Sequence, residues 1–197
     1  MEMSSFVQKI LRRLPKNPGH SFSFESWDTG QPTKESFGFL PTTQVDADRF
    51  IACVMDVDHY EGNIDYVDES RSIPDSRYTP PQQIRFYQRI RIPILGSIHQ
   101  ELVLTDAGEV DGARVAFWTM LDRETAALNK KLGARGQYSD GAWIVTPQGI
   151  GYALHSAPRR DDVGFLKWKG LTKGADVSAP TAIQGNIEGM LRWSRRS

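Results

Sequence analysis

The stretch Ile84-Arg-Phe-Tyr-Gln-Arg-Ile-Arg-Ile92 alternates apolar and basic side chains with a period of two. This alternation predicts a β-strand, because successive side chains of a strand point to opposite faces. One face then covers a core while the other meets solvent, which is typical of an antiparallel sheet. The apolar positions are Ile84, Phe86, Ile90 and Ile92, and the positions between them include Arg85, Tyr87, Arg89 and Arg91.

The chain after this strand predicts a run of further antiparallel strands. Pro93 and Gly96 supply the first turn, and Asp106-Ala-Gly108 ends the returning strand. Residues 113–122 are apolar on both faces, which indicates a central strand. The predicted strands cover residues 97–105, 113–122, 137–147 and 149–156, and Pro147-Gln148-Gly149 forms the turn of the last hairpin.

The residues before this strand predict a mixture of strands and one helix. Pro41 lies near the middle of a predicted strand, where it fits an edge strand or a bulge. Asp46 is a natural N-cap for the helix that follows it. The elements are a short strand or ordered arm within residues 20–35, a strand over 36–45, a helix over 46–60 and a short strand over 68–74.

An amphipathic helix is predicted near the N-terminus, over residues 4–14. Ser4 or Ser5 caps its start, and Phe6 and Ile10 lie on its apolar side. The opposite side is basic, so two interpretations stay open. The helix either packs on the side of the domain or touches anionic lipid as a peripheral membrane contact.

A second amphipathic helix is predicted at the C-terminus. Ser178 caps it and Pro180 lies in its first turn, where proline is tolerated. Gly185 and Gly189 remove side-chain bulk from one side, either for tight packing against neighbouring backbone or to make room for a ligand. Its apolar stripe is Ile183, Ile187, Met190 and Leu191.

Composition excludes several classes of protein. The 197 residues carry 24 basic and 24 acidic side chains, so no basic excess favours nucleic-acid binding. The single cysteine, Cys53, closes no internal disulfide, and no apolar run approaches a membrane span. With no secretory signal pattern at the N-terminus, we expect a cytoplasmic protein. We divide the chain into an N-terminal helix and arm, residues 1–35, and a main domain, residues 36–197.

Motifs for metals and nucleotides are incomplete. The stretch Asp56-Val-Asp58-His-Tyr60-Glu-Gly62 fails a calcium loop at three positions, counting Val67. Gly149-Ile-Gly151 begins a dinucleotide fingerprint but lacks its third glycine. We therefore expect neither a metal nor a cofactor.

Polar residues within the predicted strands offer two kinds of site. Gln88 and Gln100 each interrupt an apolar strand face, and a polar group on a buried face needs a partner, which a ligand can supply. His99 and His155 also fall on predicted strands, and either one pointing inward, or Glu101, would provide a general acid or base. Strand register decides which way each side chain points.

Several segments together resemble a known family. They are Val45-Asp-Ala-Asp-Arg-Phe-Ile-Ala-Cys-Val-Met-Asp-Val-Asp-His-Tyr60, Tyr66-Val-Asp-Glu-Ser-Arg71, Ile84 to Pro93, Gly141-Ala-Trp-Ile-Val-Thr-Pro147 and Met190-Leu-Arg-Trp193. In this order they resemble START-like domains, the steroidogenic-acute-regulatory-related lipid transfer domains, and their helix-grip (SRPBCC) superfamily, which includes polyketide cyclases. The resemblance covers residues 36–195. Two family motifs are replaced, one by His99-Gln100-Glu101 and one by Gly62-Asn63-Ile64.

The resemblance implies an α+β fold in which a seven-stranded curved antiparallel sheet grips the long C-terminal helix, here with an extra N-terminal helix. It also implies an apolar cavity between sheet and helix that holds a lipid or another hydrophobic small molecule. We expect a carrier or sensor, and a cyclase-, aromatase- or hydrolase-type enzyme using a cavity histidine or Glu101 is the alternative. The candidate ligand-binding residues are Phe86, Gln88, Gln100, Phe117, Thr119, Trp143, Tyr152, Ile183, Ile187 and Met190.

Overall fold

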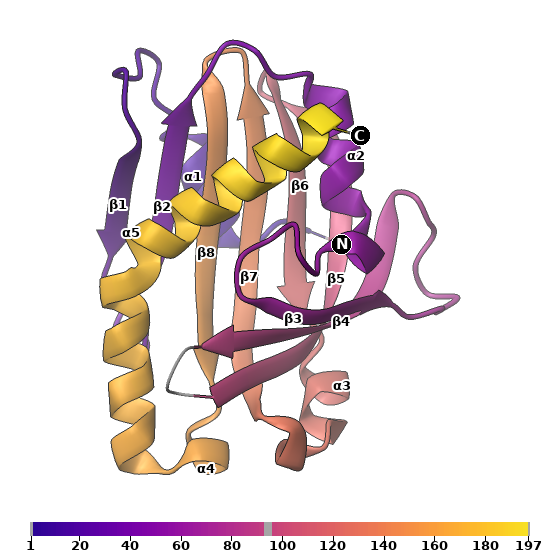
Figure 1. Cartoon of the computed structure of the whole chain (residues 1–197), viewed down its shortest axis with the longest axis vertical. Coiled ribbons are helices and arrows are strands. Elements are labelled where there is room, and N and C mark those ends of the chain that lie inside the picture. Colours follow the sequence, from indigo (N-terminus) through magenta and orange to yellow (C-terminus); the bar gives the residue numbers. More distant parts are fainter. Residues whose placement is uncertain (1, 93–95, 197) are drawn as a thin grey trace.

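The computed structural model describes residues 2–92 and 96–196 and has an α+β architecture. A curved sheet carries the long helix α5 (Phe165–Arg196) across one face and the short helix α1 (Ser5–Leu11) on the other (Figure 1). The sheet has eight strands rather than the expected seven. The additional strand is β1 (Ser23–Trp27), which the sequence left open as a strand or an arm.

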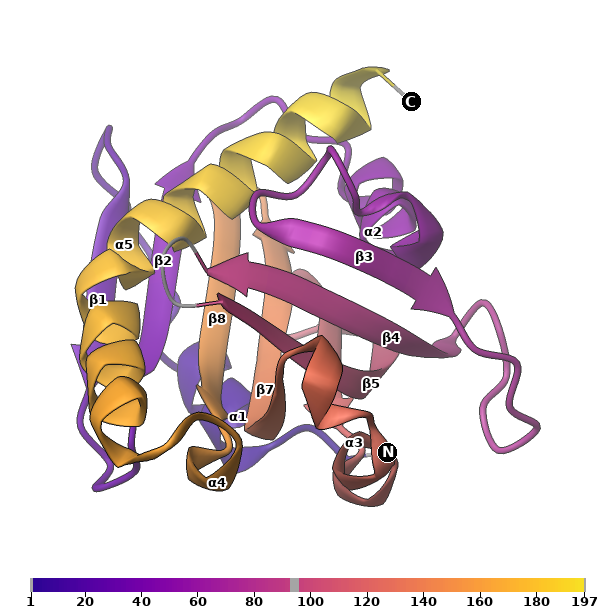
Figure 2. The ribbon, with the colours of Figure 1, turned by 60° about the horizontal axis from the view of Figure 1, so that its bottom comes forward.

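The strands run in the spatial order β1-β2-β8-β7-β6-β5-β4-β3, with every neighbouring pair antiparallel. Viewed from below, the sheet curls and α5 runs across its open side (Figure 2). The remaining strands are β2 (Glu35–Pro41), β3 (Val67–Ser72), β4 (Gln83–Ile92), β5 (Gly96–Val110), β6 (Ala113–Met120), β7 (Ala134–Thr146) and β8 (Gly149–Pro158). The remaining helices are α2 (Ala47–Met55), α3 (Asp122–Ala127), α4 (Arg160–Val163) and the 3-10 turns η1 (Val57–His59) and η2 (Lys130–Leu132).

Two expectations about strand ends are wrong. β2 is not an edge strand, because β1 pairs with its outer side, and Pro41 is its last residue rather than its middle. β5 does not end at Asp106 but continues through a bulge to Val110. Gly108 makes this bulge possible with a φ of 71°, and its N–H donates to the Asp106 carboxylate at 2.8 Å. The predicted turn at Pro93 lies outside the described residues.

The start of the C-terminal helix was also predicted wrongly. α5 begins at Phe165, and Ser178 lies within it, where its hydroxyl donates to the Gly174 carbonyl at 2.9 Å. A serine two residues before a proline is typical of a helix start, but the same hydroxyl also bonds back to the preceding turn inside a helix. Pro180 removes one backbone donor there, and α5 changes direction along its length (Figure 1).

Helix α1 packs on the outer face of the sheet. Ser4 caps it by accepting a hydrogen bond from the Val7 N–H at 3.3 Å. Phe6 and Ile10 are 3% and 0% exposed and belong to an outer core that includes Phe117. Of the two interpretations, this supports the one in which the apolar side of α1 packs on the domain. Lipid contact through Phe6 and Ile10 would require α1 to leave the sheet.

An inner core fills the space between the concave face of the sheet and helices α2 and α5. Asp46 caps α2 as predicted, accepting from the Arg49 N–H at 3.0 Å. Gly185 and Gly189 let α5 approach the segment after η1, because a Cβ on them would lie 2.6 Å from Asp65 Oδ2 and 2.6 Å from the Asn63 carbonyl oxygen. Tight packing is therefore the role that the structure supports for both glycines. No helix in the described part of the chain is long and apolar enough to span a bilayer.

Candidate functional site

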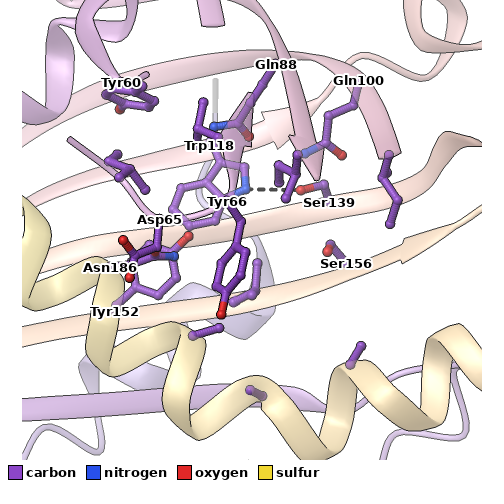
Figure 3. Close-up of a pocket in the computed structure, with 18 of the residues that line it drawn as sticks. Tyr60, Asp65, Tyr66, Gln88, Gln100, Trp118, Ser139, Tyr152, Ser156 and Asn186 are labelled. Carbon is purple, nitrogen blue, oxygen red and sulfur yellow. Dashed lines mark hydrogen bonds between the residues drawn. The ribbon is translucent and has the colours of Figure 1, made fainter. Parts of the chain in front are cut away.

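A pocket of about 530 Å³ lies between the sheet, the middle of α5 and the segment that joins η1 to β3. Its apolar wall comes from the sheet, and its polar groups stand at separate points (Figure 3). The apolar and aromatic residues include Phe86, Leu102, Leu104, Trp118, Trp143 and Tyr152. The polar residues include Asp65, Gln88, Gln100, Ser139, Ser156 and Asn186.

Strands β4 and β5 place three of the predicted residues at the pocket. Phe86 pairs with Leu102 across the two strands, and Gln88 pairs with Gln100. Directly opposed residues of an antiparallel pair present their side chains on the same face, so both pairs point inward together. The alternation that predicts β4 therefore also identifies its pocket face.

Three aromatic rings form the floor of the pocket. The ring centroids of Trp118 and Tyr152 lie 5.4 Å apart, and those of Trp143 and Tyr152 lie 4.3 Å apart. The Trp118 indole N–H donates to Ser139 Oγ at 3.2 Å. Burial raises the pKa of the Tyr152 phenol above its ordinary value, against an opposing effect of Asn186. Tyr152 is therefore a neutral hydroxyl at physiological pH.

The expected side-chain directions on β6 are wrong by one residue. Phe117 packs in the outer core with α1, and Thr119 shares its side of the strand, while Trp118 between them lines the pocket. Residues 113–122 are apolar on both faces, so their pattern carries no information about which face is inner. Trp118 was missed for this reason.

The residues of the C-terminal helix that were expected to line the pocket lie too far toward its C-terminus. Ile183, Ile187 and Met190 are fully buried in the inner core, but they do not line the pocket. The helix lines the pocket mostly through residues before Ile183, which the sequence placed before the helix or in its first turns, together with Asn186. These residues are mostly small, and their clustering was the available signal: Gly174, Ala175, Ser178, Ala179, Thr181, Ala182 and Asn186.

The segment between η1 and β3 forms part of the pocket rim. Tyr66 lines the pocket, is 44% exposed and has a φ of 66°, a left-handed conformation that is uncommon for a bulky residue. Tyr60 beside it is buried and donates its hydroxyl hydrogen to the Val54 carbonyl. Burial raises the pKa of Tyr60 well above its ordinary value, so it too stays protonated.

The three predicted acid–base candidates do not line the pocket. The Glu101 carboxylate accepts a hydrogen bond from Arg85 Nε at 2.8 Å. His99 precedes Gln100 on β5, so the two side chains point to opposite faces of the sheet. The Nδ1 of His99 lies 3.3 Å from the Tyr87 hydroxyl, and burial lowers the pKa of His99. His155 pairs with Asp140 at 3.3 Å and packs against α1. The enzymatic alternative required one of these side chains to point inward, and none of the three lines the pocket.

The ion pair between Arg135 and Asp162, near His99, makes the folded state less stable at acidic pH. Arg135 Nε and its backbone N–H donate to Asp162 Oδ2 at 2.8 and 2.9 Å, and these bonds hold the pKa of that carboxyl below its ordinary value. The Asp162 carboxylate stabilises the fold fully above its unfolded pKa of about 4, and the stabilisation is lost as the pH falls through the lower folded pKa.

We expect Asp162→Asn to lower the free energy of unfolding by about 1–3 kcal/mol at neutral pH. The difference from the parent shrinks as the pH falls below about 4, because the parent carboxyl is then protonated too. Urea unfolding at several pH values measures this. Asp161→Asn is the control, since Asp161 makes no ion pair with any described residue. A difference that stays constant down to the lowest pH would contradict the assignment.

A metal site was not expected. Within residues 2–92 and 96–196, no three His, Cys, Asp or Glu side chains are grouped so as to hold a metal ion. The segment from Asp56 to Gly62 instead forms η1 and a following turn, in which the Asp56 carboxylate accepts a hydrogen bond from His59 Nδ1 at 2.8 Å.

Comparisons with known proteins support the fold. No family model and no curated protein matches the sequence. Among solved structures, the chain is similar to a STAR-related lipid transfer protein from Xanthomonas axonopodis, with a TM-score of 0.71, 16% identity and coverage of 91% of this chain and 96% of that one. It is similar to human STARD10, with a TM-score of 0.68, 13% identity and coverage of 92% and 75%. It is also similar to the Zhui aromatase/cyclase of a Streptomyces strain, with a TM-score of 0.54, 10% identity and coverage of 89% and 94%.

Proposed function

We propose that this chain, which has the START-like helix-grip fold, binds a lipid or another hydrophobic small molecule in the pocket beneath α5 and acts as its carrier or sensor. The observation that carries the proposal is the make-up of the pocket wall. Aromatic and aliphatic side chains form most of it, and a few polar groups interrupt them. Such a wall favours ligands that gain free energy by leaving water, at about 25 cal/mol per Å² of apolar surface buried.

The pocket volume limits the size of the ligand. About 530 Å³ lies within the range of small-molecule pockets, roughly 300–1,000 Å³. A single-chain or fused-ring molecule fits this range better than a lipid with two long acyl chains. Binding without catalysis is favoured over an enzymatic role, because His99, Glu101 and His155 do not line the pocket.

Native mass spectrometry of the freshly purified chain, followed by solvent extraction, tests this proposal. We expect a discrete adduct whose extracted component is an apolar or weakly polar small molecule. A chain that shows only its own mass is next titrated with a fluorescent apolar dye. Absence of both an adduct and dye uptake would overturn the proposal, because an apolar pocket open to ligands takes up at least one of them.

A further inference from the structure

Four uncharged polar side chains line the pocket from four strands. Gln88 and Gln100 are direct partners across β4 and β5, and Ser139 and Ser156 are direct partners across β7 and β8. Figure 3 shows Gln100, Ser139 and Ser156 on one side of the pocket and Asp65 and Asn186 on the other. Gln100 reaches β7, because its Oε1 would lie 2.9 Å from a Cβ on Gly136. We call these four side chains the neutral polar cluster.

The neutral polar cluster has unused hydrogen-bonding capacity. Gln100 is 4% exposed, yet its carboxamide makes no hydrogen bond to another described residue, and the same holds for Gln88. Ser139 is 3% exposed and accepts from Trp118, which leaves its own hydroxyl hydrogen to donate. These side chains line the pocket, so a ligand with a polar group can supply the hydrogen-bond partners that the protein does not.

Few charged groups of the lining could pair with an ionised occupant. The charged side chains that line the pocket within the described residues are Asp65 and Arg91. Asp65 lies against Gly185 of α5, on the other side of the pocket from the cluster, and Arg91 is exposed. An ionised ligand group at the cluster would lose its hydration without gaining a counter-charge, which is strongly unfavourable.

We propose that the ligand of this pocket is an uncharged amphiphile whose hydroxyl or carbonyl group binds at Gln88, Gln100, Ser139 and Ser156. This inference rests on the proposed function and adds to it the chemical class of the ligand and its direction in the pocket. Two carboxamides and two hydroxyls both donate and accept, so they satisfy an alcohol or a ketone equally well. The apolar remainder of the ligand then lies along Phe86, Trp118 and Tyr152.

The test uses four probes with the same alkyl chain: dodecane, 1-dodecanol, dodecylammonium and dodecyl phosphate, each below its aggregation concentration. Affinities come from tryptophan fluorescence titrations of the delipidated full chain, since Trp118 and Trp143 line the pocket. Gln100→Leu and Gln88→Leu remove one carboxamide each while keeping an apolar side chain in its place. Gln148→Leu, in the exposed β7–β8 turn, is the matched control.

We expect dodecanol to bind at least about tenfold more tightly than either charged probe. Gln100→Leu should weaken the binding of dodecanol by about tenfold and leave the affinity for dodecane unchanged or higher. Gln148→Leu should change neither affinity. Retained dodecane binding shows that each variant still folds. A charged probe that binds as tightly as dodecanol, or dodecanol affinity unchanged in both pocket variants, would overturn the inference alone. If no probe binds, dodecane included, the proposed function fails with it.

Discussion

Gly141→Ala is expected to lower the free energy of unfolding by about 3 kcal/mol or more, the largest stability effect that we predict. A Cβ on Gly141 would lie 2.2 Å from the Ala153 carbonyl oxygen and 2.3 Å from the Trp118 ring. Ala153 belongs to the β7–β8 ladder in the middle of the sheet, and Trp118 is held against Tyr152 and Ser139. Neither neighbour has room to move away, so the added methyl group must distort the sheet.

Denaturant unfolding followed by circular dichroism measures this effect. Gly170→Ala is the matched control, because a Cβ there meets nothing within 4 Å and the residue lies in α5. Alanine is the better helix former by roughly 1 kcal/mol, so the control should be neutral or stabilising. If the two variants unfolded at the same denaturant concentration, the close packing of β7 against Trp118 would be wrong.

Ala182→Trp is expected to abolish ligand binding, the largest functional effect that we predict. Ala182 lines the pocket from α5, and an indole placed there occupies space that the ligand needs. Because the surrounding wall is apolar, the new indole ring is expected to pack inside the pocket, in the place of the ligand, rather than point into water. We expect an affinity loss of at least about a hundredfold, equivalent to roughly 2.8 kcal/mol, with the stability of the chain preserved.

Adduct formation in native mass spectrometry and dodecanol titration both report this loss. Lys173→Trp adds the same ring to an exposed position of the same helix and should bind like the parent. An Ala182→Trp variant that folds and binds with parental affinity would place the ligand elsewhere and would contradict the assigned pocket.

Local signals in the sequence predicted many of the elements correctly. The alternation of residues 84–92 predicts β4 and also its pocket face, because apolar and basic side chains differ strongly enough to identify the buried side. Ser4 and Asp46 cap their helices as expected, since capping depends on backbone groups within three residues. The order of elements, together with local sequence resemblances, indicated the START-like fold.

Other features could not be predicted because their signals are ambiguous within a short window. Ser178 and Pro180 match a helix start as well as they match a bent helix interior, and only the packing of α5 against β2 and β8 separates the two. Residues 113–122 are apolar on both faces, so the inward direction of Trp118 depends on the register of β6 with β5 and β7.

By itself, the sequence determined the α+β class, most of the strands, the caps of two helices and the residues on β4 and β5 that reach the pocket. The tertiary structure alone decided that His99, Glu101 and His155 do not line the pocket, that α5 lines it through Gly174 to Asn186, and that four neutral side chains from four strands line it. The physical reason is that a pocket is made by side chains distant in the chain, and their meeting depends on strand register and helix placement, which no local pattern encodes.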